Sequence, residues 1–350
     1  MQSPKAVKLE LMAEDHSFRV IDGQSRICSW LYNHLVERSN SLKTEFKATG
    51  NPDVAKILYT KRGLRNLVPS IKKEHAFLKS VHSSPLKNTA LRLTDSIQAY
   101  QKSKKGKRKG TSEWPKFHSW SGKWFSLFYD EPTKGFHVVD DVLHLSLGQD
   151  ESSKRLSLQF RLKEAHLLKG HSIRNMRIVC EGGTYFAIFT VNVTLPKPKP
   201  IHRMIALDPN HKNFAYGVDT SRAGIEIAAP TWLKKYDKRI DELKSKRDRC
   251  LKKAKKVAVK ASDGTPTGKE YFVPSRRWVK SQKTLERALH KRREQTKAFM
   301  FTLAHSLCRK YDCIAIGDYA PHGNGITTAM RRGMNNRSLI GRFKTEVPFL

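Results

Sequence analysis

Two aspartates, Asp208 and Asp318, stand at the ends of short apolar runs, where a nuclease holds its metal ligands. Asp208 ends MIALD, and Asp318 ends CIAIGD. A nuclease of the RNase H type uses three or four carboxylates at the ends of adjacent strands, because they hold two metal ions ~3.5 to 4 Å apart beside the scissile phosphate. One carboxylate cannot do this. Taken alone, Asp208 is explained more simply as an aspartate that ends a strand and begins a turn.

Cationic side chains recur in patterns that suit phosphate binding. Lys and Arg outnumber Asp and Glu by 67 to 32, which gives a net charge of +35 and favours a polyphosphate partner. Two predicted helices, Trp232–Val259 and Arg276–Tyr311, carry Lys and Arg at steps of three and four residues with few acids between them. A solvated helix face, a ribosomal-type protein or a membrane-surface protein is the alternative explanation of this charge.

Aromatic residues follow a basic run, KSKKGKRKG at 102–110, that reads as an exposed loop. Trp114, Phe117, Trp120 and Trp124 suit the stacking of unpaired RNA bases, although they equally suit a protein core, above all Trp124. The residues predicted to bind nucleic acid are Lys104, Lys105, Lys107, Arg108, Lys109, Trp114, Phe117, Lys234, Lys235, Arg239, Lys246, Arg247, Arg276, Arg277, Lys280, Lys283, Arg287, Lys291, Arg292, Arg331 and Arg332.

The first half of the chain must position these residues on small folded units. A strand is expected near 7–12, then a helix, and 51–100 carries helical patterns that Pro69 and Pro85 should break. From 114 to 193, short alternating runs and a hairpin signal, EGG at 181–183, predict a small antiparallel barrel that the N-terminal strand completes. The run LPKPKPI then predicts a linker and a domain boundary.

The second half has the element order of an RNase H-like domain. The runs RMIALD, NFAYGVD and IEIAAP predict three strands, the two basic helices follow with the polar loop ASDGTPTGKE between them, and CIAIGD predicts a last strand. No run approaches the ~18 to 20 apolar residues of a membrane span, and the polar start is not a signal peptide. The five cysteines lack any CxxC spacing and are predicted to be reduced packing thiols, not disulfides or zinc ligands.

Several segments together resemble the TnpB family of transposon-encoded RNA-guided nucleases, which are related to type V CRISPR effectors. IALDPNHKNFAYGVD (205–219) resembles the family's first RuvC motif, with its Asp at Asp208 and its Lys-Asn pair at Lys212 and Asn213. Further matches, in the family's order over nearly the whole chain, are SWLYNHLVERSN, WPKFHS, GGTYFAIFTV and LERALHKRREQTKAFMFTLAHSL.

The resemblance implies an α+β multidomain fold. Residues 1–40 and 111–195 would form a wedge-like β-barrel, 41–110 an inserted helical recognition subdomain, and 196–350 an RNase H-like (RuvC) α/β domain. That last domain would be truncated, since the sequence ends at EVPFL, before the family's zinc module and the strand that bears its third catalytic Asp.

The catalytic pattern departs from the family at one position. The family's second carboxylate is a Glu that closes an apolar strand, and here Gly317 takes its place. Asp318 is adjacent, but successive strand residues face opposite ways, so it rescues the site only if the strand has a bulge. We therefore expect Asp208 to be vestigial, with no catalytic residue, metal or cofactor at work.

The expected function is RNA-guided binding of DNA without cleavage, which would repress transcription. The expected partners are a guide RNA and double-stranded target DNA with a short adjacent motif, in the cytoplasm of a prokaryote at the nucleoid, and no membrane. One alternative is a Mg-dependent endonuclease that uses Asp208 and Asp318. Another is a nonfunctional transposon fragment or basic chaperone that binds RNA without specificity.

Overall fold

The computed structural model describes residues 2–107, 110–119, 123–194, 200–210, 213–260 and 266–317, together with 325, 327, 330 and 343. The chain divides into two compact units, Met1–Leu195 and Pro196–Leu350, and each has its own apolar core. The predicted linker begins at this division.

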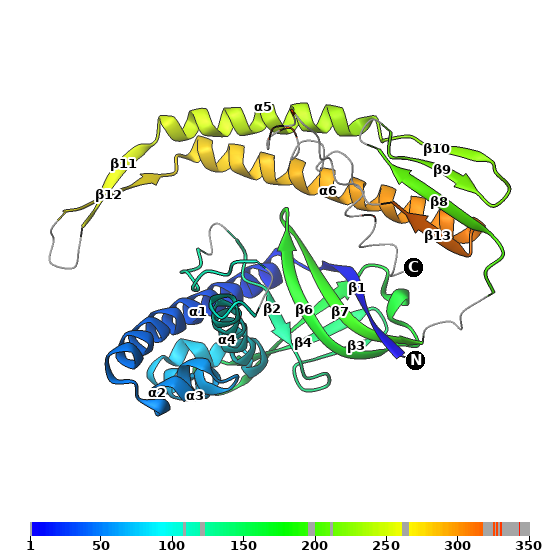
Figure 1. Cartoon of the computed structure of the whole chain (residues 1–350). Coiled ribbons are helices and arrows are strands. Elements are labelled where there is room, and N and C mark those ends of the chain that lie inside the picture. The colour runs from blue at the N-terminus through cyan, green and yellow to red at the C-terminus, as the bar shows by residue number, and fades with distance from the viewer. Residues whose placement is uncertain are drawn as a thin grey trace. The chain divides into compact units, whose positions relative to one another are not determined.

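The first unit contains a curled antiparallel sheet of seven strands (Figure 1). The strands are β1 (Gln2–Met12), β2 (Leu127–Tyr129), β3 (Phe136–Val139), β4 (Val142–Gln149), β5 (Arg155–Leu162), β6 (Ser172–Glu181) and β7 (Thr184–Thr194). Their order is β2-β6-β7-β1-β5-β4-β3. The predicted place of the N-terminal strand in the sheet is confirmed, because β1 pairs with β7 on one side and with β5 on the other.

The turn between β6 and β7 shows why the hairpin was visible in the sequence. Glu181 pairs with Thr184, so only Gly182 and Gly183 form the loop, and both have positive φ, 62° and 89°. Tight hairpin turns of this kind need two left-handed residues, which glycine adopts without strain. The predicted hairpin is confirmed.

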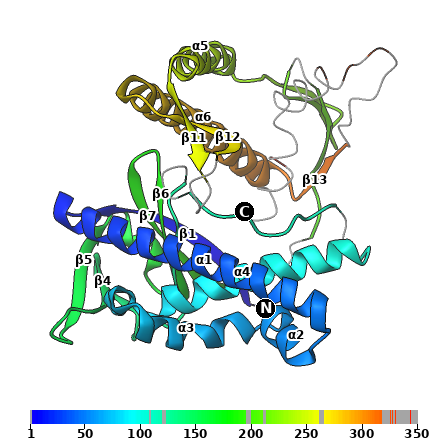
Figure 2. The ribbon, with the colours of Figure 1, turned by 90° about the vertical axis from the view of Figure 1, so that its left-hand side faces the viewer.

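The helices of the first unit pack on each other and on the sheet. They are α1 (Asp15–Thr49), α2 (Pro52–Tyr59), α3 (Gly63–Glu74) and α4 (Ser83–Lys104), with short 3-10 helices η1 (Ala76–Ser80) and η2 (Ala165–Leu168). Helix α4 lies against α1 and α3 (Figure 2). Helix α1 buries Cys28, Leu31, Leu35 and Leu42, and it ends at Gly50, which takes φ 64°. It therefore runs unbroken through residue 40, where a domain boundary was predicted.

Pro69 does not break its helix, contrary to the prediction. It lies inside α3, where it costs a hydrogen bond and about 3 kcal/mol relative to a good helix former. Leu64, Val68 and Ile71 of the same helix are buried in the core, and this packing outweighs the cost. Pro85 lies in the first turn of α4, where a missing N–H is tolerated.

The second unit begins with a four-stranded sheet. Its strands are β8 (Met204–Pro209), β9 (Ala215–Asp219), β10 (Gly224–Ile227) and β13 (Cys313–Ile316), in the order β10-β9-β8-β13. Strand β13 pairs parallel to β8, and the other pairs are antiparallel. Ile205 and Leu207 of β8 are buried in one core with Met300 and Ala304, whereas Asp208 lies on the opposite, exposed face.

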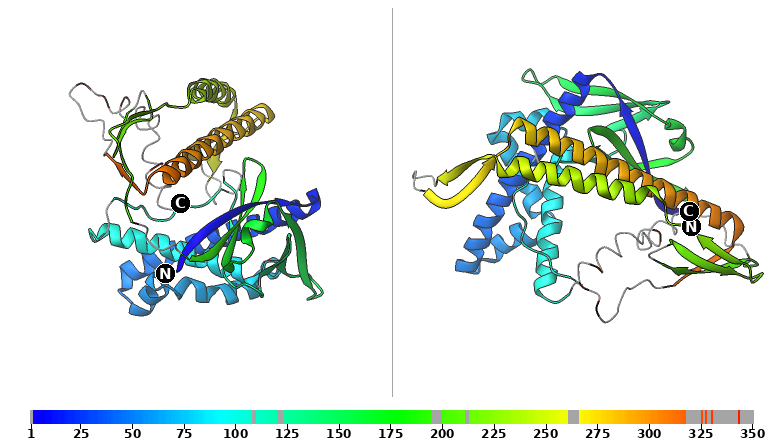
Figure 3. Two further views of the ribbon diagram at one scale, coloured as in Figure 1. Left: turned by 90° about the vertical axis from the view of Figure 1, so that its right-hand side faces the viewer. Right: turned by 90° about the horizontal axis from the view of Figure 1, so that it is seen from above.

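Two long helices form an antiparallel pair in this unit (Figure 3). They are α5 (Trp232–Lys252) and α6 (Arg276–Lys310), joined by the paired strands β11 (Lys255–Lys260) and β12 (Pro266–Val273). The prediction that the first helix reaches Val259 was wrong, and so was the predicted loop from Pro266 onward, whereas its residues 261–265 lie outside the described residues. The alternating KKVAVK, with two β-branched valines, favours a strand once a partner such as Tyr271 lies opposite Val257.

All five cysteines are unpaired, as predicted, and burial raises the pKa of the Cys28 thiol to about 12. In the part of the chain that the structure describes, no helix combines the length and apolar character needed to cross a bilayer.

Candidate nucleic-acid interface and carboxylate site

The parallel pairing of β13 with β8 brings position 317 beside Asp208. Ile316 pairs with Leu207, and the Gly317 N–H continues the ladder with a 2.9 Å bond to the Leu207 carbonyl. A Cβ at Gly317 would lie 3.8 Å from Asp208 Oδ1. The position at which the TnpB resemblance predicts a Glu is therefore the one whose side chain would point at Asp208.

A row of polar side chains crosses the exposed face of this sheet, and the sequence reading missed it. Asp208 pairs with Tyr216, and Tyr216 with Glu226, so the three share one face. The Asn213 amide donates hydrogen bonds to the Tyr216 hydroxyl and to Glu226 Oε1. Period-two alternation in β9 and β10 was the available signal.

Glu226 shares this face with Asp208 but does not lie beside it. It lies two strands from Asp208, roughly 9 to 10 Å across the sheet, which is too far for both to hold one ion at ~2 Å. Among the described residues, no group of three His, Cys, Asp or Glu ligand atoms includes Asp208. The residue that the rival nuclease would need, Asp318, lies outside the described residues.

The helices α5 and α6 form a surface hollow lined by cations. Lys235 and Arg239 of α5 and Arg287 and Lys291 of α6 line a space of about 450 Å³, together with Tyr236, Thr284 and Ala288. A second hollow, about 480 Å³, shares Arg287 and extends along α6, and a third extends along α5. Eight residues that line these hollows were predicted from the sequence to bind nucleic acid. We call them together the cationic trough: Lys235, Arg239, Lys246, Arg276, Lys280, Lys283, Arg287 and Lys291.

The trough has the electrostatics of a phosphate-binding surface. Within the described part of the chain, none of its eight side chains forms an ion pair, and all are exposed. From Arg276 to Lys291 the helix rises roughly 22 Å, enough to follow about six phosphates of one strand. The predicted Arg277 is also exposed on α6, but it lines none of the three hollows.

Two residues predicted to bind nucleic acid, Arg247 and Arg292, instead hold α5 and α6 together. Arg292 Nε donates to Asp237 Oδ1 at 2.8 Å, and Arg247 contacts Asp248 and, across the helix pair, Gln282. Both arginines are less exposed than the trough residues, with Arg292 at 22%. Because their guanidinium groups already have partners, their contacts favour a structural role over the predicted one.

We expect the substitution Arg292→Ala to lower the unfolding free energy by about 1 kcal/mol, since it leaves Asp237 without its partner. Arg287→Ala should change stability by less than about 0.5 kcal/mol while weakening nucleic-acid binding. Urea unfolding and DNA binding of both variants check this. If the two variants were equally stable and lost binding equally, the assignment of a structural role to Arg292 and a binding role to Arg287 would be contradicted.

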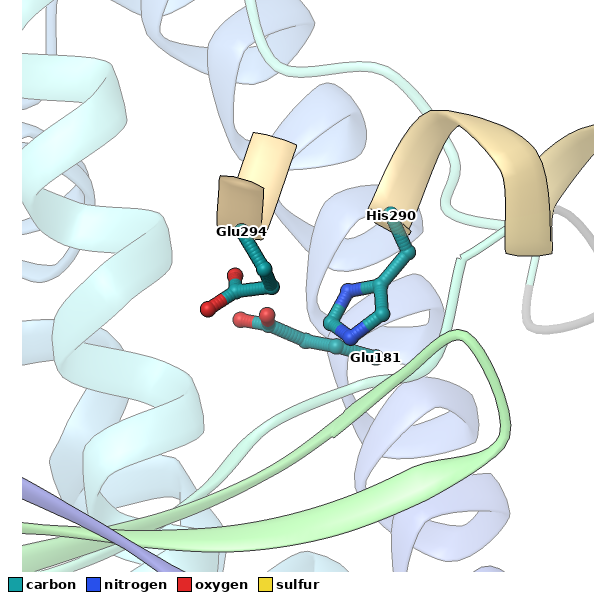
Figure 4. Close-up of side chains that lie close together, drawn as sticks. All are labelled: Glu181, His290 and Glu294. Atoms are coloured by element: carbon teal, nitrogen blue, oxygen red, sulfur yellow. The ribbon is translucent and has the colours of Figure 1, made fainter. Parts of the chain in front are cut away.

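Another cation of α6, Arg293, contacts an imidazole and a carboxylate of the same helix. His290 and Glu294 project from successive turns of this helix (Figure 4). Arg293, between them, lies 2.9 Å from His290 Nδ1 and 3.5 Å from Glu294 Oε1. Arg293 is therefore engaged within its own helix and does not count among the trough cations.

Residues 114–119 and 123–125 have no helix or strand and are fastened along α1 in the first unit; we call these two stretches the strap. The Ser25 hydroxyl exchanges hydrogen bonds with the backbone of Phe125, and the Ser29 hydroxyl lies 2.8 Å from His118 Nδ1. Asn33 both donates to the His118 carbonyl and accepts from its N–H. Since residues 25, 29 and 33 recur every four positions, these anchors lie on one face of α1.

Trp114 anchors the other end of the strap through its own side chain, and its role in nucleic-acid binding stays a prediction. Its Nε1 donates to Asn40 Oδ1 at 2.7 Å, Lys43 Nζ lies 3.9 Å from its ring centroid, and Tyr100 packs edge-on at 5.3 Å. A ring with these contacts has little surface left for a base. Trp124 and Phe125 are packed against the core, as the sequence favoured.

The strap predicts a dependence of stability on pH. Burial, and then the positive charges of Arg92 and Lys123, lower the pKa of His118 below its ordinary value near 6.5. The unfolded chain then binds more protons in the window between the two pKa values. Stability is therefore complete above about pH 6.5 and is lost as the pH falls.

We expect the melting temperature to fall by a few degrees between pH 7 and pH 5.5, and less in His118→Asn. The half-buried His82, whose pKa burial also lowers, adds to the effect in the same direction and remains in that variant. Exposed His166 gives a matched control, His166→Asn. A pH profile that is identical in all three proteins would contradict the assignment to His118.

The remaining predicted residues are only partly placed. Lys104, Lys105 and Lys107 are exposed at and beyond the end of α4. Phe117 is 63% exposed on the strap. Lys234 lies in α5, but its side chain is outside the description, and the predicted residues Arg108, Lys109, Arg331 and Arg332 lie outside the described residues.

Comparison with known proteins shows the fold. No protein-family profile and no curated protein matches the sequence. The solved structure of a Cas12f1-sgRNA-target DNA complex is similar to this chain, with 10% identity and a TM-score of 0.52. The matched region covers 98% of this chain and 87% of the Cas12f1 chain. A CRISPR-Cas12f ternary complex (12% identity, 96% and 74% covered, TM-score 0.30) and a Cas12i1 R-loop complex (9%, 90% and 50%, 0.34) are also similar. At such low identity, the first match shows a Cas12f-like multidomain fold.

Proposed function

We propose that this protein is an RNA-guided DNA-binding protein that holds its target without cutting it. The observation that carries the proposal is the cationic trough, eight exposed cations along one helix pair that form no ion pair with any residue the structure describes. The fold adds support, since the similar Cas12f1 structure is a complex with a single guide RNA and target DNA. In such a complex base pairing selects the sequence, and the protein supplies charge and geometry.

The absence of cleavage in this proposal rests on Gly317. A Cβ there would face Asp208 at 3.8 Å, yet glycine offers no carboxylate, and Glu226 is tied to Asn213 two strands away. In-line hydrolysis by two metal ions needs several carboxylates at one place. An RNase H-like domain with one isolated Asp208 would serve as a scaffold for binding.

Binding without release would block transcription at the target. We infer a guide RNA and a double-stranded DNA with a short adjacent motif as partners, in the cytoplasm of a prokaryote at its nucleoid. The curled sheet with β1 to β7 would act as the wedge, α2 to α4 as the recognition subdomain, and the second unit as the RuvC-like part.

The test begins with the RNA that co-purifies with the full chain. Sequencing should give discrete molecules of uniform length that share a scaffold, and a reporter with a site matching the variable segment should lose transcription. A scrambled guide is the matched control. Heterogeneous RNA, or equal reporter output with both guides, would contradict RNA-guided repression.

Cleavage is tested on the same complex. Programmed plasmid should remain supercoiled in magnesium, and Asp208→Ala should leave DNA binding unchanged. Magnesium-dependent linearisation that Asp208→Ala abolishes would instead establish the endonuclease alternative.

A further inference from the structure

Phe117 is an apolar ring that the fold holds in solvent. It is 63% exposed, more than any other large apolar side chain of the described residues. No aromatic partner or cation-π contact of its ring is found among those residues. Exposed phenylalanine is unfavourable by about 1.5 to 3 kcal/mol relative to a buried one, so an exposed ring on an ordered segment needs an explanation.

The strap is held on both sides of this ring, through the backbone of His118 and through the side chain of Trp114. Asn33 forms two hydrogen bonds, of 2.9 and 2.7 Å, with the backbone of His118, the next residue. Three residues earlier, Trp114 is bonded to Asn40 and covered by Lys43. A ring that is held at both flanks loses little conformational freedom on binding, which is how preorganised sites gain affinity.

Cations lie at, or act on, the two residues next to Phe117 in the chain. Lys116 precedes it and is 80% exposed, with only a solvent-exposed ion pair to Glu113. Arg92 and Lys123 act on the neighbouring His118 as positive charges. An aromatic ring among cations matches the combination with which proteins bind single-stranded nucleic acid, where bases stack on rings and cations neutralise phosphates.

We propose that Phe117 is a stacking platform for one unpaired base of bound RNA. The proposal rests on RNA binding as part of the proposed function. Asn33 and Asn40 act as positioning residues, because they touch the strap and not the base. Trp114, the neighbouring ring that shares the sequence signal, is an anchor of the platform.

The experiment measures binding of a 12-nucleotide single-stranded RNA that contains one 2-aminopurine, whose fluorescence is quenched by stacking. Phe117→Ala should lower affinity roughly 5- to 150-fold and remove the quenching. Phe117→Tyr should retain both, whereas Phe117→Leu, apolar but not aromatic, should behave like the alanine variant. Phe77→Ala, which removes another exposed phenylalanine (44%), is the matched control and should bind normally.

A second arm separates stacking from a general loss of binding. With RNA that is fully base-paired, Phe117→Ala should bind like the original protein, because no unpaired base is available. In Asn33→Ala, hydrogen exchange at residues 117–119 should accelerate, and the added effect of Phe117→Ala should shrink, since the ring is no longer held.

The outcomes divide clearly. If the original protein binds single-stranded RNA but Phe117→Ala binds and quenches like it, or if Phe77→Ala is equally weak, the stacking role is wrong and RNA binding stands. Failure of the original protein to bind any RNA overturns both the stacking role and the proposed function.

Discussion

Replacing Gly317 by glutamate is expected to create a divalent-cation site beside Asp208. The new Cβ would lie 3.8 Å from Asp208 Oδ1, and its other neighbours, Pro209 Cδ at 3.4 Å and the Leu207 carbonyl at 3.5 Å, are at ordinary contact distance. Gly317 is not among the glycines with positive φ, so a side chain is accommodated without backbone strain. Two carboxylates on adjacent strands can then share one ion.

The expected gain in Mn²⁺ affinity is at least about tenfold, roughly 1.4 kcal/mol, measured by titration calorimetry or electron paramagnetic resonance. Without metal, Gly317→Glu should be less stable than the original protein, because two close carboxylates repel, and Mn²⁺ should restore the loss. Stability against added Mn²⁺ therefore provides a second readout.

Three matched variants make this result interpretable. Gly317→Gln has the same size without charge and should gain nothing, and Gly317→Glu with Asp208→Ala should lose the gain. Gly224→Glu adds an acid in open space at the start of β10 and should also gain nothing. If the double variant keeps the full affinity, the new glutamate does not act with Asp208, and our account of a site missing one carboxylate fails.

The second large effect is expected from neutralising the centre of the cationic trough. The variant combines Lys235→Ala, Arg239→Ala, Arg287→Ala and Lys291→Ala. If each side chain contacts one phosphate, the slope of log affinity against log salt should become shallower by about 3.6, or ~0.9 for each contact with duplex DNA. At ~0.15 M salt this corresponds to roughly a thousandfold weaker binding.

The loss should be similar for matched and unmatched DNA, because phosphate contacts carry no sequence information. Four exposed lysines of the first unit provide a control with the same change of charge: Lys5, Lys134, Lys154 and Lys169. DNA binding measured from ~50 to ~300 mM salt checks the prediction. Equal slopes for the two quadruple variants would mean that overall charge, and not the trough, holds the nucleic acid.

Local patterns in the sequence were enough to predict many elements. Period-three and period-four apolar spacing marked α1, paired glycines marked the turn after β6, and the short apolar run RMIALD marked β8. These signals are readable because they depend on neighbours within a few positions of the same chain. The strand β11 was not predicted, because the sequence KKVAVK is compatible with a helix end or a strand until its partner β12 is known.

The sequence alone also identified the candidate residues by type: Asp208, the glycine at 317 and the excess of Lys and Arg. Which of them meet was decided by the tertiary structure. The register of β13 on β8 places Asp208 and Gly317, which are 109 residues apart in the chain, side by side. Arg292 of α6 forms its ion pair with Asp237 of α5, and Trp114 of the strap donates a hydrogen bond to Asn40 of α1. Each pairing depends on residues distant in sequence, whose approach follows only from the packing of whole elements, so no local pattern can encode it.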